Sequence, residues 1–368
     1  MKKHNIKMSE KIYQLQRRGF DLGRVKLAPK NCTRQALDTI VLQQAWQQGE
    51  ASVLPKMCAV NEYQNEINQS SSLYSAVLSG ESSCDELLDH EPYSNRLVTH
   101  FESLGSSINE GDDQEIETVL FDAIENEQVV AEDLWMKASW LSFHDEDASL
   151  RFRFSFGVDL HEDVAADQSR QHYASFLTDA VFPESRLISE NIDLKQSLKS
   201  IIKSDKLSFV ERIIYFNSPN GGAYLHHDRE RGHAGVVYAQ LTGETLWLAL
   251  SKQQLILEIS RFVENCQQQQ VWPEALDQNV RKTLLAYAAD QKMCGDQLES
   301  FANDTLIQLI NETAEFVQYL INQGYSRHLI AGDVLLLPQE TEMNCCWHSV
   351  FCLGEVTGQA LSFAIRTD

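Results

Sequence analysis

The sequence has no apolar run near the roughly 18–20 residues that a membrane-spanning helix needs, and no apolar segment follows its basic N-terminus. We therefore expect neither a membrane span nor a signal peptide, and we expect a cytoplasmic protein. The eight cysteines show no CxxC pair and no regular spacing, which indicates free thiols in a reducing compartment. No internal repeat is visible.

Basic residues are also scarce. Lysine and arginine together number 31 against 53 acidic residues, which gives a net charge of −22. A surface of this sign repels phosphate backbones and anionic membranes, so neither nucleic acid nor a membrane is expected as a partner. We interpret the excess of acidic residues as a feature that keeps the protein soluble, in preference to a sign of a basic substrate. With 368 residues the chain is long enough for two domains and a sizeable core.

The first part of the chain, residues 1–148, is expected to be mainly helical. Its polar and basic start, 1–30, is expected to form a loose arm. Apolar residues at helical spacing run through 33–48, where Thr33 is the expected N-cap, and again through 114–143.

The second part, residues 149–368, is predicted to be rich in strands. In 149–157 apolar residues alternate with Arg151, Arg153 and Ser155, which predicts a half-buried strand. Further strands are predicted at 207–216, 235–241, 245–250, 328–338, 347–353 and 359–366. Residues 252–324 have helical spacing and are interpreted as an insertion between strands. Many short strands with turn glycines are typical of a sandwich or barrel.

A His-x-Asp pair lies at His226 and Asp228, between two glycine turns. In an extended segment a period of two places both side chains on one face. A third metal-binding side chain is available at His348, in a predicted strand. Two histidines and one carboxylate form the facial triad that binds iron and leaves other positions open. We therefore predict a metal site with His226, Asp228 and His348 as ligands.

Two similar pairs, His161 with Asp163 and His144 with Glu146, lie in acid-rich stretches that no pair of apolar strands follows. They are interpreted as surface loops. Beside the main motif, His227 is expected to point to the opposite face of its segment.

Other neighbours of the motif are left open. His233 is either a residue of the cavity mouth or a surface turn residue. Arg229 and Arg231 either meet an anionic group of a substrate or pair with surface acids. Three more side chains are interpreted equally as packing or as partners of the ligands: Tyr215, Asn217 and Tyr224.

Four segments resemble the cupin-like, Jumonji-C-type branch of the iron(II)/2-oxoglutarate-dependent oxygenases. The first contains the ligand pair, the second a strand-turn-strand, the third a Gly-Asp strand, and the fourth the distal histidine and the closing strand. They read LHHD, VVYAQLTGETLWLAL, IAGDVLLLPQE and WHSVFCLGEVTGQALSFAIR. The resemblance covers roughly 207–250 and 326–366.

With the patterns above, this resemblance implies an α+β fold. A double-stranded β-helix (jelly-roll, cupin-like) barrel is expected, with a mainly helical N-terminal region and a helical insertion between barrel strands. The resemblance also implies Fe(2+) held by the three ligands, with 2-oxoglutarate and O2 as cosubstrates. The implied reaction hydroxylates a C–H bond of an amino acid, a peptide or protein side chain, or a small metabolite, and releases succinate and CO2.

One position departs from the branch. There, a lysine two residues after the turn glycine binds the distal carboxylate of 2-oxoglutarate, whereas this chain has Thr245. Other branches use an arginine on the last strand, and Arg366 follows His348 by 18 positions. The resemblance thus makes Arg366 the predicted anchor of 2-oxoglutarate, with Ser362 or Thr245 adding a hydroxyl contact. Members of the family that halogenate have a small residue in place of the carboxylate ligand, where chloride binds the iron. Because Asp228 is present, the resemblance makes halogenation unexpected.

Two alternatives stay open. The first is a cupin-type metal enzyme whose substrate chelates the metal itself, without 2-oxoglutarate, which Thr245 motivates. The second is a non-catalytic metal-binding or scaffold protein whose helical half carries an interaction surface. Independently of the function, the insertion 252–324 is expected to cap the mouth of the site or to form a homodimer through helical regions.

Overall fold

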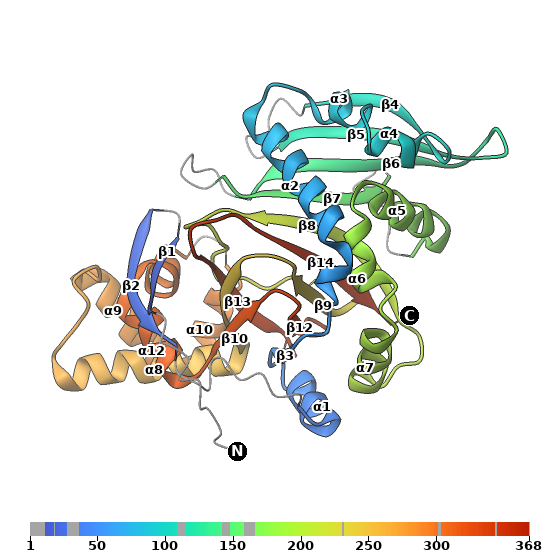
Figure 1. Cartoon of the computed structure of the whole chain (residues 1–368). Coiled ribbons are helices and arrows are strands. Elements are labelled where there is room, and N and C mark those ends of the chain that lie inside the picture. The colour runs from blue at the N-terminus through green and yellow to red at the C-terminus, as the bar shows by residue number, and fades with distance from the viewer. Residues whose placement is uncertain are drawn as a thin grey trace, which may run out of the picture.

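The computed structural model (Figure 1) combines a large twisted sheet, a smaller sheet and two groups of helices. It describes residues 12–17, 19–27, 37–108, 115–141, 148–157, 166–229, 232–300, 303–342 and 344–367. The two His-x-Asp-like pairs at His144 and His161, and also Thr33 and Arg231, lie outside these residues.

The large sheet is antiparallel and nine-stranded. In sheet order it contains β3 (Ser52–Leu54), β12 (Val334–Pro338), β9 (His233–Gln240), β14 (Gly358–Arg366), β8 (Ser208–Asn217), β7 (Leu150–Phe156), β6 (Gln128–Trp140), β5 (Glu115–Glu125) and β4 (Phe101–Ser107). Its outer face packs against α2 (Gln64–Ser79), α5 (Gln168–Val181) and α7 (Ile192–Ile202) in one apolar core.

The smaller sheet contains β11 (Ser326–Ile330), β10 (Glu244–Ser251) and β13 (Cys346–Leu353), all antiparallel. The segment at His226 joins it through a bridge to His348. Side chains from both sheets, among them Tyr238, Leu335 and Trp247, form a shared core. The two sheets therefore face one another.

From β8 to β14 the chain passes repeatedly between the two sheets. The His226 segment lies between β8 and β9, the pair β10–β11 lies between β9 and β12, and β13 precedes β14. The result is a mixed helix and sheet fold with a large antiparallel sheet, which is consistent with the predicted jelly roll.

The predicted strand at 149–157 is confirmed as β7. Leu150, Phe152 and Phe154 are buried on the face toward the helices, while Arg151 and Arg153 lie on the opposite face. The alternation in the sequence thus marks the two faces of this strand correctly.

The helix expected in 114–143 is wrong, because this segment forms β5 and β6. Its buried residues recur every second position, as Val119, Phe121 and Ala123 show. Asn126 and Glu127 join the strands with φ angles of 50° and 64°, the conformation of a two-residue hairpin turn. The helical spacing of apolar residues here was incidental.

The N-terminal region is therefore mixed rather than mainly helical. The expected arm contains a hairpin of β1 (Ile12–Arg17) and β2 (Phe20–Lys26). The helix predicted in 33–48 is α1 (Thr39–Gln47), capped by Asp38, whose carboxylate accepts the Ile40 N–H at 2.8 Å. The expected boundary at 148/149 falls between β6 and β7, which pair in one sheet.

Short elements connect these parts. They are the 3₁₀ turns Val60–Tyr63 and Pro183–Ser185 and the helices α3 (Cys84–Leu88), α4 (Tyr93–Leu97) and α6 (Arg186–Ser189). Cys58 and the six other cysteines that the structure describes are free and buried, as the spacing predicts. Within the described ranges, no helix is both long and apolar enough to cross a membrane.

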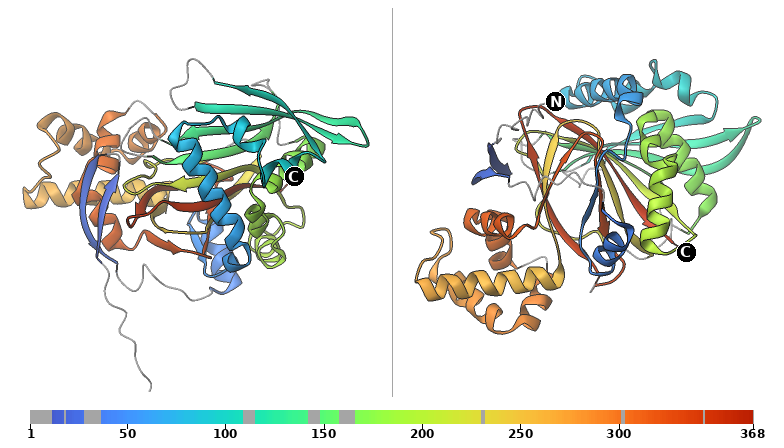
Figure 2. Two further views of the ribbon diagram at one scale, coloured as in Figure 1. Left: turned by 45° about the horizontal axis from the view of Figure 1, so that its top comes forward. Right: turned by 60° about the horizontal axis from the view of Figure 1, so that its bottom comes forward.

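The insertion is confirmed as helical and lies between β10 and β11. It contains α8 (Lys252–Gln269), α9 (Gln278–Ala289), α10 (Gln291–Leu298), α11 (Asp304–Ile307), a π-helical segment (Gln308–Glu312) and α12 (Ala314–Gln323). Its apolar side chains share a core with the β1–β2 hairpin and with β10 and β13. Figure 2 shows the hairpin beside these helices.

Candidate metal centre and cavity

Residues of both sheets line a cavity of about 440 Å³. This volume lies within the range of small-molecule binding sites. The three predicted ligands, His226, Asp228 and His348, all lie on its wall. The sequence-based motif and the cavity therefore coincide.

The structure brings the three side chains together. Nε2 of His226 lies 3.2 Å from Oδ1 of Asp228, and Nε2 of His348 lies 3.3 Å from Oδ2 of the same carboxylate. One possible ligand atom from each residue falls within 4.8 Å of the others. Among the described residues, these three side chains form the group that is close enough together to hold one metal ion.

Backbone pairing fixes the two histidines beside each other. The N–H of His226 donates to the carbonyl of His348 at 3.0 Å, and the reverse bond measures 2.8 Å. Asp228 follows two positions later, so its carboxylate returns to the same side. His348 itself is buried in the middle of β13, opposite Ala249 of β10.

Second hydrogen bonds orient both imidazoles. Nδ1 of His226 lies 2.7 Å from the carbonyl oxygen of Tyr224, and Nδ1 of His348 lies 3.2 Å from that of Cys346. A carbonyl oxygen only accepts, so each Nδ1 carries the proton and each Nε2 presents a lone pair to the centre. Histidines that bind metals are commonly held in this way.

Electrostatics favour the metal-binding protonation states. Burial alone would raise the pKa of Asp228, but His348 and His226 outweigh burial and hold this pKa well below its ordinary value. Burial and the neighbouring His226 lower the pKa of His348. At neutral pH the site thus offers an ionised carboxylate and a neutral His348, which are the forms that bind divalent metals.

A glycine allows the ligand segment to approach β13. Gly222 has a φ of +139°, and a Cβ at this position would lie 2.0 Å from the carbonyl oxygen of Val350. The next residue, Ala223, exchanges hydrogen bonds of 3.2 and 3.0 Å with Val350. A side chain at position 222 would push the segment away from the strand that carries His348.

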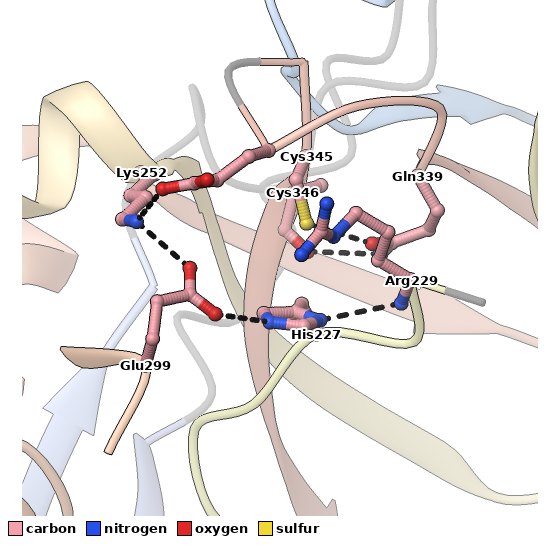
Figure 3. A network of polar contacts seen from close by, with 8 residues as sticks. His227, Arg229, Lys252, Glu299, Gln339, Cys345 and Cys346 are labelled. Atoms are coloured by element: carbon pink, nitrogen blue, oxygen red, sulfur yellow. Dashed lines mark hydrogen bonds and ion pairs between the residues drawn. The ribbon is translucent and has the colours of Figure 1, made fainter. Parts of the chain in front are cut away.

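The neighbours of the motif fall into two groups. His233 and Asn217 are buried on the cavity wall, which the half-buried Tyr215 and Tyr224 also line. His227 points away, as predicted. Its ring stands against Trp347 at 4.8 Å. Its Nε2 lies 3.1 Å from Oε2 of Glu299, toward which it points in Figure 3. The side chain of Arg229 is exposed.

Of the three residues predicted to bind 2-oxoglutarate, one lines the cavity and two do not. Ser362 lines the cavity. Thr245 is buried and not on the wall; its hydroxyl donates to Gln240 at 2.8 Å and accepts from Trp247 at 3.0 Å. Arg366 is not among the described residues that line the cavity, and its guanidinium packs against Gly232.

Two arginines of β7 line the cavity and were not predicted to do so. Arg151 donates from Nε to the Ser139 hydroxyl at 2.9 Å, and no described carboxylate pairs with it. Arg153 forms an ion pair with Glu211. Glu211 sits at a bulge between β8 and β14 with a φ of +50°, a strained backbone of the kind found near active sites.

Aromatic side chains complete the wall between these arginines and the ligands. Burial, together with the charge of Asp228, raises the pKa of Tyr215 to about 12. Tyr238 packs edge-on against Trp247 at 4.6 Å, and the Trp247 ring lies 5.4 Å from that of His348. The alternation in 149–157 predicted that the two arginines share one face of the strand. That this face lines the cavity is visible only in the tertiary structure.

No family model matches the sequence. No curated protein matches it either. Among solved structures, a 2OG-Fe(II) oxygenase family oxidoreductase from Burkholderia pseudomallei matches with a TM-score of 0.32 and 8% identity, over 92% of this chain and 93% of the other.

YcfD from E. coli matches with a TM-score of 0.30 and 12% identity, over 90% of this chain. This chain spans 54% of the length of that protein. YcfD, described as a ribosomal oxygenase, also matches in its complex with cobalt and succinic acid, with a TM-score of 0.24, 14% identity and coverage of 78% and 44%.

All three TM-scores lie below 0.5 and all three identities below 25%, so the chemistry of the site rests on its own residues.

Proposed function

We propose that the chain is an iron(II)/2-oxoglutarate-dependent oxygenase. The observation that carries this proposal is the group of His226, Asp228 and His348 on the wall of one cavity. The proposed reaction is hydroxylation of a C–H bond with release of succinate and CO2. The repeated crossing of the chain between two facing sheets supports a double-stranded β-helix as the scaffold.

The donor set fits a divalent metal ion. Neighbouring ligands of an octahedral ion at about 2.1 Å are about 3 Å apart. The distances from Asp228 to the two Nε2 atoms, 3.2 and 3.3 Å, are close to that value. Two imidazoles and one carboxylate on one side are the ligand set of iron(II) oxygenases with open positions.

Iron bound here would supply dioxygen activation coupled to oxidative decarboxylation of 2-oxoglutarate. The chain itself holds the ligands: the carbonyls of Tyr224 and Cys346 fix the imidazole tautomers. Tyr238 and Trp247 exclude water from the side of His348. The polar wall at Arg151 orients an anionic ligand.

The anchor of the distal carboxylate has two candidates. The resemblance favours Arg366, with Ser362 or Thr245 nearby. The cavity favours Arg151, because this residue lines the wall and only its Nε is occupied by a described partner. We propose Arg151 as the anchor, with Ser362 as a further contact on the same wall.

The substrate class stays broad. An amino acid, a peptide or protein side chain, or a small metabolite fits a cavity of this volume. The neighbour YcfD is described as a ribosomal oxygenase, which keeps protein substrates in the set. A cytoplasmic location and a homodimer through helical regions stay predictions.

The proposal is tested by the conversion of 2-oxoglutarate to succinate in iron-loaded protein. Succinate formation is expected in the wild type and is expected to vanish in His226→Ala and Asp228→Ala, which each remove a ligand. His172→Ala, an exposed histidine on α5, is the matched control and should behave as the wild type. Undiminished succinate formation in both ligand variants would refute the proposal.

A second outcome would favour the cupin-type alternative. The Thr245 hydroxyl is engaged with Gln240 and Trp247, and position 245 carries no charge for a cosubstrate. A wild type that binds the metal at the three ligands but shows no calorimetric binding of 2-oxoglutarate would indicate a metal enzyme that does not use this cosubstrate.

A further inference from the structure

Two of the three ligands lie in a loop rather than in a strand. The segment from Gly221 to Arg229 leaves β8 and pairs with β13 through the backbone of Gly221, Ala223 and His226. A loop that carries metal ligands must be ordered by contacts outside itself, because each free residue costs about 1–2 kcal/mol to fix. Besides the pairing with β13, such contacts come from the insertion 252–324 and from the β1–β2 hairpin.

The first contact is made by Asn311, which precedes α12. Its Oδ1 accepts the N–H of Leu225, the residue before His226, at 2.8 Å. The same oxygen accepts from Nη2 of Arg17 at 3.2 Å. Asn311 is 4% exposed and Arg17 is fully buried, so water does not replace these bonds.

Arg17 extends this contact to the rest of the loop. Its Nη1 donates to the carbonyl of Ala223 at 3.0 Å, and its Nη2 donates to the carbonyl of Asn311 at 2.8 Å. The guanidinium stacks 5.0 Å from the Tyr224 ring. Tyr224 in turn supplies the carbonyl that receives the Nδ1 proton of His226. A continuous path therefore runs from the insertion to a ligand.

Asn311 lies in the π-helical segment Gln308–Glu312, between α11 and α12. Such segments are rare, and they occur frequently at functional sites. The departure from α-helical geometry here coincides with the position whose side chain accepts the Leu225 N–H of the ligand loop.

The second contact holds the residue between the two loop ligands. Nε2 of His227 lies 3.1 Å from Glu299, just after α10. Glu299 is held by Lys252 at 2.8 Å, and Lys252 also pairs with Glu342 at 2.5 Å. Figure 3 shows Glu299 between His227 and Lys252. The backbone N–H of Arg229 donates to the His227 ring at 3.3 Å.

We infer that the helical insertion orders the loop of the metal centre, with Asn311 and Glu299 as positioning residues for His226 and Asp228. This inference rests on the metal site of the proposed function. Asn311 fixes the loop just before the first ligand, and Glu299 fixes it between the two. Together they order the loop before the ion arrives, which raises the affinity for the metal.

The test is the affinity of metal-free protein for Co2+, measured anaerobically by its visible absorption. Asn311→Ala is expected to weaken Co2+ binding about tenfold, the lower end for partners that orient metal ligands. Asn311→Asp keeps an acceptor for Leu225 and Arg17 and should stay within about twofold of the wild type. Asn265→Ala, an exposed asparagine on α8, is the matched control and should be unchanged.

Glu299→Ala tests the second contact separately. Its side chain is 31% exposed, so this variant tests the inference even where Asn311→Ala does not fold. It is also expected to weaken Co2+ binding about tenfold. All titrations are run well below the thermal unfolding midpoint of each metal-free variant, so that a loss of stability alone leaves the measured affinity unchanged.

The outcomes separate this inference from the proposed function. Wild-type affinity in both Asn311→Ala and Glu299→Ala would overturn the inference while leaving the metal centre intact. A wild type that binds no Co2+ would overturn the metal centre and the inference with it. Weaker binding in both variants, with rescue by Asn311→Asp, would establish Asn311 and Glu299 as positioning residues.

Discussion

At the scale of single residues, the cavity contrasts with the molecule around it. The chain carries a net charge of −22, yet its cavity wall holds Arg151 and Arg153. Arg153 is paired with Glu211, whereas Arg151 uses only its Nε, on a serine hydroxyl. A guanidinium on the wall of a cavity in an acidic protein favours a carboxylate, because its planar fork can donate two parallel hydrogen bonds to the two oxygens.

Arg151→Gln tests this assignment against Arg366→Gln. In metal-loaded protein, Arg151→Gln is expected to weaken binding of 2-oxoglutarate by about 10–100-fold, since a hydrogen bond to a charged group contributes about 1.5–3 kcal/mol. Binding of 2-oxopentanoate, which lacks the distal carboxylate, should change little. Calorimetry with both ligands measures the two effects.

The same experiment has a clear opposite result. If Arg366→Gln loses the preference for 2-oxoglutarate and Arg151→Gln keeps it, the arginine of the last strand is the anchor, as the resemblance implies. A preference retained in both single variants would contradict both assignments.

At the scale of elements, a buried carboxyl joins three segments outside the cavity. Oε1 of Glu184 accepts from Ser70 of α2 and from Gln359 of β14, each at 2.5 Å. Oε2 is buried without a described partner. Burial raises the pKa of Glu184, and the two hydrogen bonds oppose this only in part.

Glu184→Gln is therefore expected to change the pH dependence of stability. A raised pKa in the folded state means that folding takes up a proton. In the wild type, the stability that this proton contributes is fully present below about pH 4.5, the ordinary pKa of glutamate. It is lost as the pH rises through the raised pKa of Glu184. Relative to the wild type, the variant should therefore gain unfolding free energy as the pH rises from pH 4 to pH 8.

Urea unfolding at a series of pH values measures this difference. Glu81→Gln, on an exposed residue near the end of α2, is the matched control for the loss of one carboxyl group. A stability difference between Glu184→Gln and the wild type that is independent of pH would contradict a raised pKa for this carboxyl.

The elements also show how far sequence patterns reach. Alternation predicted β7, and helical spacing predicted the insertion between β10 and β11. The same spacing failed in 114–143, where Val119, Leu120 and Ala123 match a helical stripe but burial recurs at every second residue. The deciding signal was local: the turn at Asn126 and Glu127, where both residues have positive φ and close a hairpin.

At the scale of the whole molecule, the site depends on which strands are neighbours. His348 follows Asp228 by 120 positions, and the sequence predicted their meeting from the His-x-Asp pair, the strands that follow it and the strand of His348. The second wall of the cavity was not predictable in this way. Arg151 reaches it because β7 pairs with β8, a neighbour relation that no local pattern encodes.

The same holds for the support of the ligand loop. Arg17 and Asn311 are far apart in the sequence, and neither lies in a motif. They meet because the β1–β2 hairpin packs on the insertion (Figure 2). The insertion interrupts the strand pattern of the sequence, yet in the structure its Asn311 and Glu299 contact the ligand loop.

The central claim is that His226, Asp228 and His348 bind one divalent metal ion. Anaerobic calorimetric titration of metal-free protein with Fe(2+) tests it most directly. The wild type is expected to bind one ion per chain at this site, and His348→Ala is expected to weaken that binding by about 100-fold or more. Equal binding by the wild type and His348→Ala, or no binding by the wild type, would contradict the claim.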